Sequence, residues 1–317
     1  MVAGARKERR VEQGVLEYDV VILGSGPAGL QAALHAARSK VSVAVLGRMQ
    51  KSSLFKAHVE NYCCLERTIS GHELLEQGRQ QAEKFGATFL DIDVVDIERM
   101  EDGRCLITLE SEEKVSAWSI ILAMGVSRHL LNVPGEKEYL GKGVSYCVDC
   151  DANFFRNQVV VVAGGESAAA FGALTLLLVA AEVHLVYDEL LVDEHLKYHV
   201  ERSGIHKHSG RSVKEIRGTQ GVEAVVLDNG EEIKAYGIFI EQGAKGALEL
   251  ATKLDIALDS EMCYVAVNKK QETSVPGIYA AGDLCGPPWQ MAKAVGEGCV
   301  AGLEASAHAK HRRSKKT

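Results

Sequence analysis

Two stretches of the chain repeat one order of apolar and polar positions. Residues 18–47 ("YDVVILGSGPAGLQAALHAARSKVSVAVLG") read as an apolar strand, a glycine-rich turn, a helix and a second apolar strand. Residues 157–189 repeat that order. A strand, turn, helix and strand of this length form a dinucleotide-binding unit, so the repeat predicts two doubly wound α/β domains.

Shorter alternating segments complete both units. Residues 104–110 and 118–125 alternate like strands that return to the first sheet, and residues 221–243 form a matching set with a "DNG" hairpin turn. A strand within residues 277–283 and a helix from residue 291 suit the first unit again. We therefore expect two Rossmann-like domains of the three-layer ββα/α type, with the second inserted in the first.

The expected domain boundaries follow from this pattern. Residues 17–127 and 253–317 form a discontinuous first domain, residues 128–252 form the inserted domain, and residues 1–16 form a flexible N-terminal tail. The helix expected over residues 168–181 carries no charged side chain. Such a helix is normally buried on all sides, which predicts a dimer interface or another covering partner.

The overall composition is that of an ordinary globular chain, with 317 residues of which 46% are apolar. The net charge of -7 argues against a nucleic-acid-binding protein. Basic residues gather at both ends, where we expect solvated termini, with a weak peripheral contact to an anionic membrane as the alternative. No apolar run reaches the roughly 18 residues that span a bilayer, and a signal-peptide core is lacking, so we expect a cytoplasmic protein without a transmembrane segment.

The first glycine-rich turn has the full G-x-G-x-x-G pattern in Gly24, Gly26 and Gly29. These glycines allow a tight turn, the close approach of a pyrophosphate and the packing of the helix on the strand. In the distant "AAGD" segment, Asp283 is placed to hold a ribityl hydroxyl, or to cap a helix. The combination favours FAD over NAD in the first domain.

One cysteine pair stands out among the eight cysteines of the chain. Cys147 and Cys150 form a C-x-x-C followed by Asp151, a spacing that allows a small redox-active disulfide ring. Half of a zinc site and a pair of buried structural thiols are the competing interpretations. We expect no metal, because no second C-x-x-C or H-x-x-x-H is expected to complete four ligands. Beside a flavin, the pair suggests two-electron exchange.

Several motifs together resemble the low-molecular-weight thioredoxin reductase family over residues 17–306. They are "GSGPAGL", "VENY" (59–62), "AMG" (123–125), "CVDCD", "FFRNQ" (154–158), and "AAGD" followed by Gln290. The resemblance implies that Cys150 lies against the flavin, that Cys147 exchanges with a partner disulfide such as that of thioredoxin, and that Asp151 is the acid or base. It also implies a homodimer. The positions that it assigns to FAD are Gly24, Gly26, Pro27, Ala28, Gly29, Gly47, Asn61, Val94, Gly125, Gly282, Asp283, Trp289, Gln290 and Met291.

The second turn departs from the NADPH-using members of that family. It reads Gly164, Gly165, Glu166 and Ser167, so a carboxylate stands at the middle glycine, where a pyrophosphate must approach. Two like charges about 4 Å apart repel by about 1 kcal/mol even in water. The arginines of the family's 2'-phosphate clamp are replaced by Asp188, Glu189 and, further on, Asp193. The sequence therefore predicts that NADPH is not used.

The segment 285–298, with Trp289 before Gln290, resembles the pyridine-nucleotide-independent branch of the family. Within it, the cyanobacterial diflavin-linked disulfide oxidoreductases are the nearest likeness, and they hold a second FAD in the vacated site. The alternatives are that Trp289 is a plain core residue and that the second site is simply lost. Asp188, at a strand end, also permits an unphosphorylated ribose, as in NADH. Tyr187 before it suits a stacking face or a buried position.

We therefore expect a flavin-dependent disulfide oxidoreductase that exchanges two electrons between FAD and the Cys147–Cys150 disulfide without NADPH. One FAD is expected in the first domain, and a second FAD in the former NADPH site. The alternatives are a ferredoxin- or NADH-linked thioredoxin reductase and, outside the enzymes, a flavin-bound redox sensor or interaction module. The same residues serve both directions of electron flow.

Overall fold

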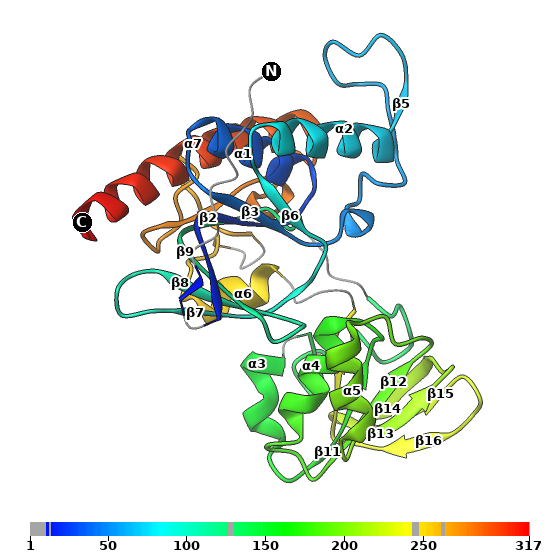
Figure 1. The fold of residues 1–317 in the computed structure, drawn as a ribbon. Coiled ribbons are helices and arrows are strands. Elements are labelled where there is room, and N and C mark those ends of the chain that lie inside the picture. The colour runs from blue at the N-terminus through cyan, green and yellow to red at the C-terminus, as the bar shows by residue number, and fades with distance from the viewer. Residues whose placement is uncertain are drawn as a thin grey trace. The chain divides into compact units, whose positions relative to one another are not determined.

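The computed structural model describes residues 11–12, 14–125, 130–146, 148–242, 247–260 and 264–316. The chain forms two compact units, which Figure 1 draws. The first comprises residues 1–109, 113–126 and 250–317, and the second comprises residues 110–112 and 127–249. Each unit has its own sheet and its own buried core. The predicted α/β class with Rossmann-like parallel sheets is confirmed.

The sheet of the first unit is built around β2 (Val15–Leu23), which pairs in parallel with β3 (Val43–Leu46) on one side and β9 (Lys114–Leu122) on the other. Its last six residues are all buried, as a strand covered on both faces requires. The full order is β6–β3–β2–β9–β8–β7, and in addition β1 pairs with β2 and β18 pairs with β9. The bounds of the remaining strands are β1 (Val11–Glu12), β6 (Thr88–Leu90), β7 (Val94–Arg99), β8 (Cys105–Leu109) and β18 (Ile278–Ala280).

Helices α1 (Pro27–Arg38) and α7 (Met291–Lys316) lie together over the sheet of the first unit (Figure 1). Their contact is made of small residues. A Cβ atom added at Gly298 would lie 2.2 Å from the carbonyl oxygen of Ala28, and one at Gly302 would lie 2.5 Å from that of Ala32. The two helix backbones therefore approach closely, which fixes the start of α1 against the rest of the unit.

The second unit has three layers. Its five-stranded parallel sheet has the order β10–β17–β11–β12–β13. Along β11 (Val159–Ala163) the side chains alternate between two cores, one shared with helices α4 (Ser167–Leu176) and α5 (Glu194–Arg202) and the other with an antiparallel sheet. The remaining bounds are β10 (Val144–Ser145), β12 (Glu182–Tyr187), β13 (His206–Ser209), β14 (Val213–Gly218), β15 (Val222–Leu227), β16 (Glu232–Lys234) and β17 (Gly237–Ile240).

Short elements connect these parts. They are β4 (His58–Val59), β5 (Ile69–Ser70), α2 (Gly71–Lys84), α3 (Val148–Asp151), α6 (Ala247–Lys253) and three 3-10 turns, η1 (Met49–Lys51), η2 (Ala152–Phe155) and η3 (Asp283–Cys285). The N-cap residue of helix α2 is Ser70, whose side chain accepts a hydrogen bond from the Glu73 backbone N–H. The helix therefore has a capped N-terminus.

Two expectations about local structure need correction. The predicted flexible tail over residues 1–16 is wrong for residues 11, 12 and 14–16, because β1 pairs with the start of β2 across a turn that Gly14 makes with φ +81°; residues 1–10 lie outside the described part. The helix expected over residues 168–181 ends at Leu176, since the Ala181 N–H donates to Gln158 and β12 begins at the next residue. Leu178 is 83% exposed, so burial on all sides does not hold for this segment within the chain.

No helix among the described residues combines the length and the apolar character that crossing a membrane requires.

Candidate dinucleotide and dithiol sites

The first glycine-rich turn leaves no room for side chains at two of its glycines. Gly24 follows β2 with φ +112°, and a Cβ atom there would lie 2.3 Å from the carbonyl oxygen of Ala123. A Cβ atom at Gly29 would lie 1.9 Å from the carbonyl oxygen of Gly24. Gly26 is the N-cap of α1, Pro27 is its first residue and Ala28 is buried. The turn thus holds the helix start directly at the end of the strand.

The N-terminus of α1 is suited to bind an anion. No side chain caps it, and its first turn has no acidic residue. Its unpaired backbone N–H groups and the positive end of the helix dipole therefore remain for a phosphate group. The dinucleotide expected here is FAD, and the glycine turn and uncapped helix fit its pyrophosphate.

Further residues predicted to hold FAD come from neighbouring strand ends of the first unit. Gly47 follows β3 and receives a hydrogen bond from Ser25 Oγ at 3.0 Å. A Cβ atom at Gly47 would lie 3.6 Å from the Cα atom of Gly24, so the two turns are adjacent. Val94 is buried at the start of β7, and Gly125 follows β9.

Two predicted residues that are 229 positions apart meet in the structure. Asn61 Nδ2 donates to Gln290 Oε1 at 3.2 Å. Gln290 precedes Met291, the first residue of α7, and Trp289 is 60% exposed. The alternative of a core tryptophan at position 289 is therefore wrong, and the side chain is available to a ligand.

Gly282 and Asp283 lie at the end of β18, beside a charged pair that the sequence did not indicate. Glu297 accepts hydrogen bonds from the Gly282 N–H at 2.8 Å and from Lys293 Nζ at 3.0 Å, and Lys293 also donates to the Gly282 carbonyl at 2.9 Å. Burial raises the pKa of the Asp283 carboxyl; Lys293 opposes this shift and Glu297 adds to it. A hydroxyl group that donates to Asp283 would stabilise its charged form. This pair could have been predicted, because Lys293 and Glu297 are one helix turn apart in the sequence.

The dithiol segment is described only in part. Cys147 lies outside the described residues, and of Cys150 the structure describes the backbone, which is in α3. Asp151, at the end of that helix, accepts a hydrogen bond from Ser145 Oγ at 2.7 Å. The buried Glu241 accepts a hydrogen bond from the Val148 N–H at 3.0 Å, which places a carboxylate at the start of the C-x-x-C helix. Glu241 was not predicted, because it follows β17, far along the chain.

The second glycine-rich turn has the same element order as the first, with a different charge. Glu166 is the N-cap of α4, as Gly26 is of α1, and Ser167 is the first residue of the helix. A Cβ atom at Gly164 would lie 2.0 Å from the carbonyl oxygen of Glu241. Glu166 therefore stands where the first turn has Gly26, and since its side chain makes no capping hydrogen bond, neither helix start has a side-chain cap.

The loop after β12 closes onto this second turn. The Leu191 N–H donates to the Gly165 carbonyl at 2.6 Å, and a Cβ atom at Gly165 would lie 2.1 Å from the carbonyl oxygen of Glu189. Asp188 and Glu189 are exposed at this loop, while Tyr187 is half-buried against the core of α4 and α5. The acidic residues and the turn thus form one continuous surface.

Comparison with known proteins agrees with this geometry. The model of the pyridine nucleotide-disulphide oxidoreductase family matches residues 18–298. The chain belongs to this family. A bifunctional thioredoxin reductase/thioredoxin from Mycobacterium leprae (strain TN) is 34% identical over 299 residues, which cover 91% of this chain and 65% of that protein. The chain therefore spans about two thirds of the length of this relative.

Solved structures give the same family likeness. An atypical thioredoxin reductase from Desulfovibrio vulgaris Hildenborough is 34% identical, with 92% of this chain and 98% of that chain covered and a TM-score of 0.82. A ferredoxin-flavin thioredoxin reductase from Clostridium acetobutylicum is 30% identical, with 93% and 99% covered and a TM-score of 0.67. The protein is thus a thioredoxin reductase-like flavin oxidoreductase.

In this thioredoxin reductase-like enzyme, the residues of the first glycine-rich turn would hold FAD, which would supply a two-electron carrier when bound. The chain's own residues do the positioning. The backbone of the first turn would receive the pyrophosphate, Asp283 would offer an acceptor carboxylate, and the Asn61–Gln290 pair joins the loop after β4 to the start of α7. In the second unit, Asp151 is a carboxyl group within the C-x-x-C segment that can take or release a proton.

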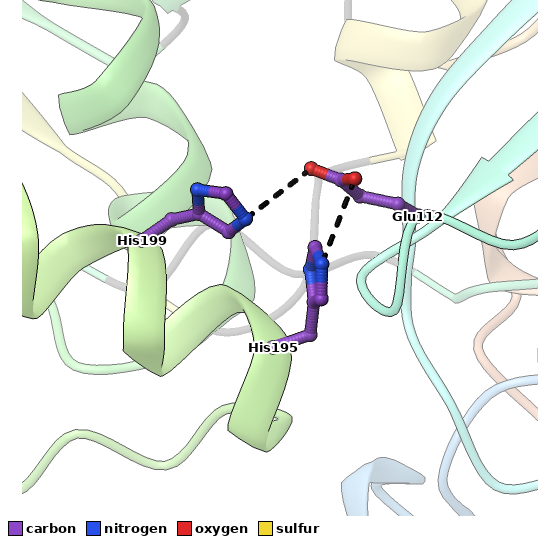
Figure 2. Close-up of side chains that lie close together, drawn as sticks. All are labelled: Glu112, His195 and His199. Atoms are coloured by element: carbon purple, nitrogen blue, oxygen red, sulfur yellow. Dashed lines mark ion pairs between the residues drawn. The ribbon is translucent and has the colours of Figure 1, made fainter.

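One statement about metal-binding spacing needs correction. The expectation that no H-x-x-x-H pair is present is wrong, because His195 and His199 form one on α5. Figure 2 shows both rings directed at Glu112, which is grouped with the second unit, with Nε2 to carboxylate distances of 3.6 and 3.7 Å. All three side chains are exposed.

Proposed function

We propose that this protein exchanges two electrons between FAD and the Cys147–Cys150 disulfide without using NADPH, and that a second FAD takes the place of NADPH in the second unit. A thioredoxin-type disulfide is the exchange partner at the dithiol. The observation that carries the proposal is the pair of exposed acidic residues, Asp188 and Glu189, on the loop that contacts Gly165 of the second turn.

A negative side chain at a helix N-terminus is favourable for the helix itself, because the dipole and the unpaired N–H groups attract it. Glu166 therefore competes with an incoming pyrophosphate for the same field. In the first turn the equivalent residue is Gly26, which leaves that field to the ligand. FAD carries a pyrophosphate as NADPH does, so Glu166 weakens the binding of both unless the pyrophosphate enters the second site along a different line.

The loop after β12 supports the same distinction. NADPH differs from NADH by a 2'-phosphate, which proteins hold with arginine forks. Here Asp188 and Glu189 are exposed on the loop that contacts Gly165. A carboxylate at the end of this strand accepts hydrogen bonds from the hydroxyls of an unphosphorylated adenosine ribose, as FAD carries, but repels a phosphate.

The exchange balances without any nicotinamide nucleotide. Formation of the Cys147–Cys150 disulfide breaks two S–H bonds, makes one S–S bond and releases two electrons and two protons. The electron pair and one proton pass to oxidised FAD, and Asp151 at the end of α3 takes the other proton. The reverse process reduces the disulfide.

The test is an anaerobic titration of the purified protein with NADPH, combined with the FAD content per chain. We expect two equivalents of FAD per chain and no bleaching of the flavin by a large excess of NADPH, while dithionite bleaches it fully. A triple variant, E166G/D188R/E189R, should bind NADPH more tightly than the native chain and lose the second equivalent of FAD. Rapid bleaching of the native protein by NADPH would overturn the proposal.

A second candidate is a ferredoxin-linked thioredoxin reductase, which the likeness to the Clostridium acetobutylicum enzyme favours. It predicts one equivalent of FAD per chain and reduction of the flavin by reduced ferredoxin at catalytic rates. The FAD content therefore separates the two candidates, since both share the dithiol and the absence of NADPH use.

A further inference from the structure

Histidines and glutamates gather on one edge of the second unit. His184 of β12 lies beside His206 of the edge strand β13 in parallel register. Because side chains alternate along a strand, Glu182 shares the face of His184, and His208 shares the face of His206. The rings of His184 and His206 are stacked with centroids 4.8 Å apart.

Hydrogen bonding orients the His184 ring. Its Nδ1 atom lies 3.0 Å from His208 Nε2, and His208 Nδ1 lies 3.6 Å from Glu231 Oε1. If an ion takes the Nε2 lone pair of His184, its Nδ1–H donates to His208 Nε2, and the proton of His208 then lies on Nδ1 beside Glu231. The lone pair of His184 is then on Nε2, which lies 3.7 Å from Glu182 Oε2. A metal-binding histidine characteristically donates its other ring N–H in this way.

We propose that Glu182, His184 and His206 bind a divalent transition-metal ion of the zinc class. Their ligand atoms all lie within 4.8 Å of one another. Tetrahedral zinc with ligands at about 2.1 Å needs ligand separations of about 3.4 Å. Glu182 and His206 are exposed, so their side chains can rotate to close this difference, while His184 is held at 15% exposure by its neighbours.

The ion would add a covalent link between two strands that already share backbone hydrogen bonds and histidine ring contacts. β13 is the edge strand of the parallel sheet, and β12 continues from the site to Tyr187 and Asp188 at the second glycine-rich turn. Three protein ligands leave a fourth position for water. His208 and Glu231 act as positioning residues, because they orient His184 and do not reach the ion.

The His195–His199 pair of Figure 2 is the natural comparison. It also offers two imidazoles near a carboxylate, but the His195 Nδ1 atom is buried without a hydrogen-bond partner among the described residues, so nothing fixes that ring for an ion. The two clusters therefore differ in their supporting contacts more than in their ligands.

The test uses the full chain with FAD bound and the redox disulfide oxidised, in a C63S/C64S background that removes two exposed thiols. Zinc affinity is measured by competition with a chromogenic chelator, and the coordination shell by X-ray absorption. We expect one tightly bound zinc per chain with nitrogen and oxygen ligands at about 2.0–2.1 Å and no sulfur. H206A and E182Q, at exposed positions, should abolish tight binding without affecting folding. H208A should weaken binding about 10- to 100-fold.

The double variant H195A/H199A is the matched control and should bind zinc like the parent protein. Zinc should also raise the Tm of the parent and of this control, and leave that of H206A unchanged. The proposal is overturned if the parent binds no zinc, if H206A and E182Q bind as tightly as the parent, or if binding disappears in H195A/H199A.

Discussion

At Gly24, the space for a single methyl group decides whether the first turn can form. Replacement by alanine brings a Cβ atom to 2.3 Å from the Ala123 carbonyl oxygen at a backbone φ of +112°. Strain of this kind costs about 1–3 kcal/mol, and the steric contact adds to it. We expect Gly24→Ala to lose FAD and to unfold at lower urea concentration, measured by flavin release and circular dichroism.

Gly86 provides the control for this prediction. Its φ is also positive, at +97°, but a Cβ atom there meets nothing within 4 Å. Gly86→Ala should therefore show only the backbone cost of about 1 kcal/mol and keep its FAD. If both variants lost the same stability and both kept FAD, close packing at the first turn would not be the reason for Gly24.

Asp151 is the charged residue whose role in exchange is most directly testable. We expect Asp151→Asn to slow reduction of a partner disulfide about 10²- to 10⁴-fold, as loss of a general acid or base does. Ser145→Ala removes the hydrogen bond to this carboxylate, and should change the pH profile of the rate with a smaller loss of speed. Rapid-mixing kinetics of dithiol oxidation would measure both. An unchanged rate in the asparagine variant would remove Asp151 from the chemistry.

His308 of α7 gives the first unit a pH dependence of stability. Burial, with Arg312 and His311 nearby, lowers the pKa of this imidazole, against a smaller opposing effect of Glu272. The unfolded chain then binds the proton first on acidification. Stability is full above about pH 6.5 and falls as the pH drops from there through the lowered folded pKa.

His308→Gln should therefore flatten the fall in unfolding free energy between pH 7.5 and 5.5, measured by urea denaturation. The exposed His58→Gln replaces another histidine of the same unit and serves as the control, with a pH dependence like that of the parent. A glutamine variant at position 308 that retains the full pH dependence would contradict this explanation.

Among the elements, the contact of α1 with α7 depends on glycines of one helix. Alanine at Gly298 would place its methyl group 2.2 Å from the carbonyl oxygen of Ala28, which forces the helices apart. Overpacking of this kind costs about 1–3 kcal/mol. Gly296, on the same helix, has nothing within 4 Å of an added Cβ atom, so its replacement should stabilise α7 by up to about 1 kcal/mol. Urea denaturation of the two alanine variants should shift in opposite directions.

The repeated element order could be predicted from the sequence, because the strand, turn and helix of each unit are contiguous. The strands β9 and β18 were expected in the first unit, but their pairing with each other was not predicted. The end of α4 could not be predicted, because no residue of "LTLLLVAA" is a helix breaker. The helix ends because the Ala181 N–H donates to the Gln158 carbonyl instead of continuing the helix. The histidine cluster was missed for a similar reason. His184 and His206 meet only when β13 pairs beside β12, and the sequence shows two separate strands.

At the scale of the whole molecule, the chain passes from the first unit to the second and back, and each unit buries its own core. The residues that were predicted to hold FAD share the first unit, and Asn61 meets Gln290 there. Of the two dithiol cysteines, Cys150 lies in the second unit, and Cys147 is outside the described residues. The ligand of each unit is therefore best identified in one experiment that follows the two units separately.

Separate cores predict two transitions in calorimetric unfolding, and each ligand should raise the Tm of the unit that binds it. A ligand at 100 times its Kd stabilises by about 2.7 kcal/mol. Gly298→Ala identifies the transition of the first unit, because it weakens only the α1–α7 contact. Excess FAD should then raise both transitions, zinc only that of the second unit, and NADPH neither. If FAD raised the first transition alone, the second flavin would be excluded, and a single cooperative transition would show that the units do not unfold independently.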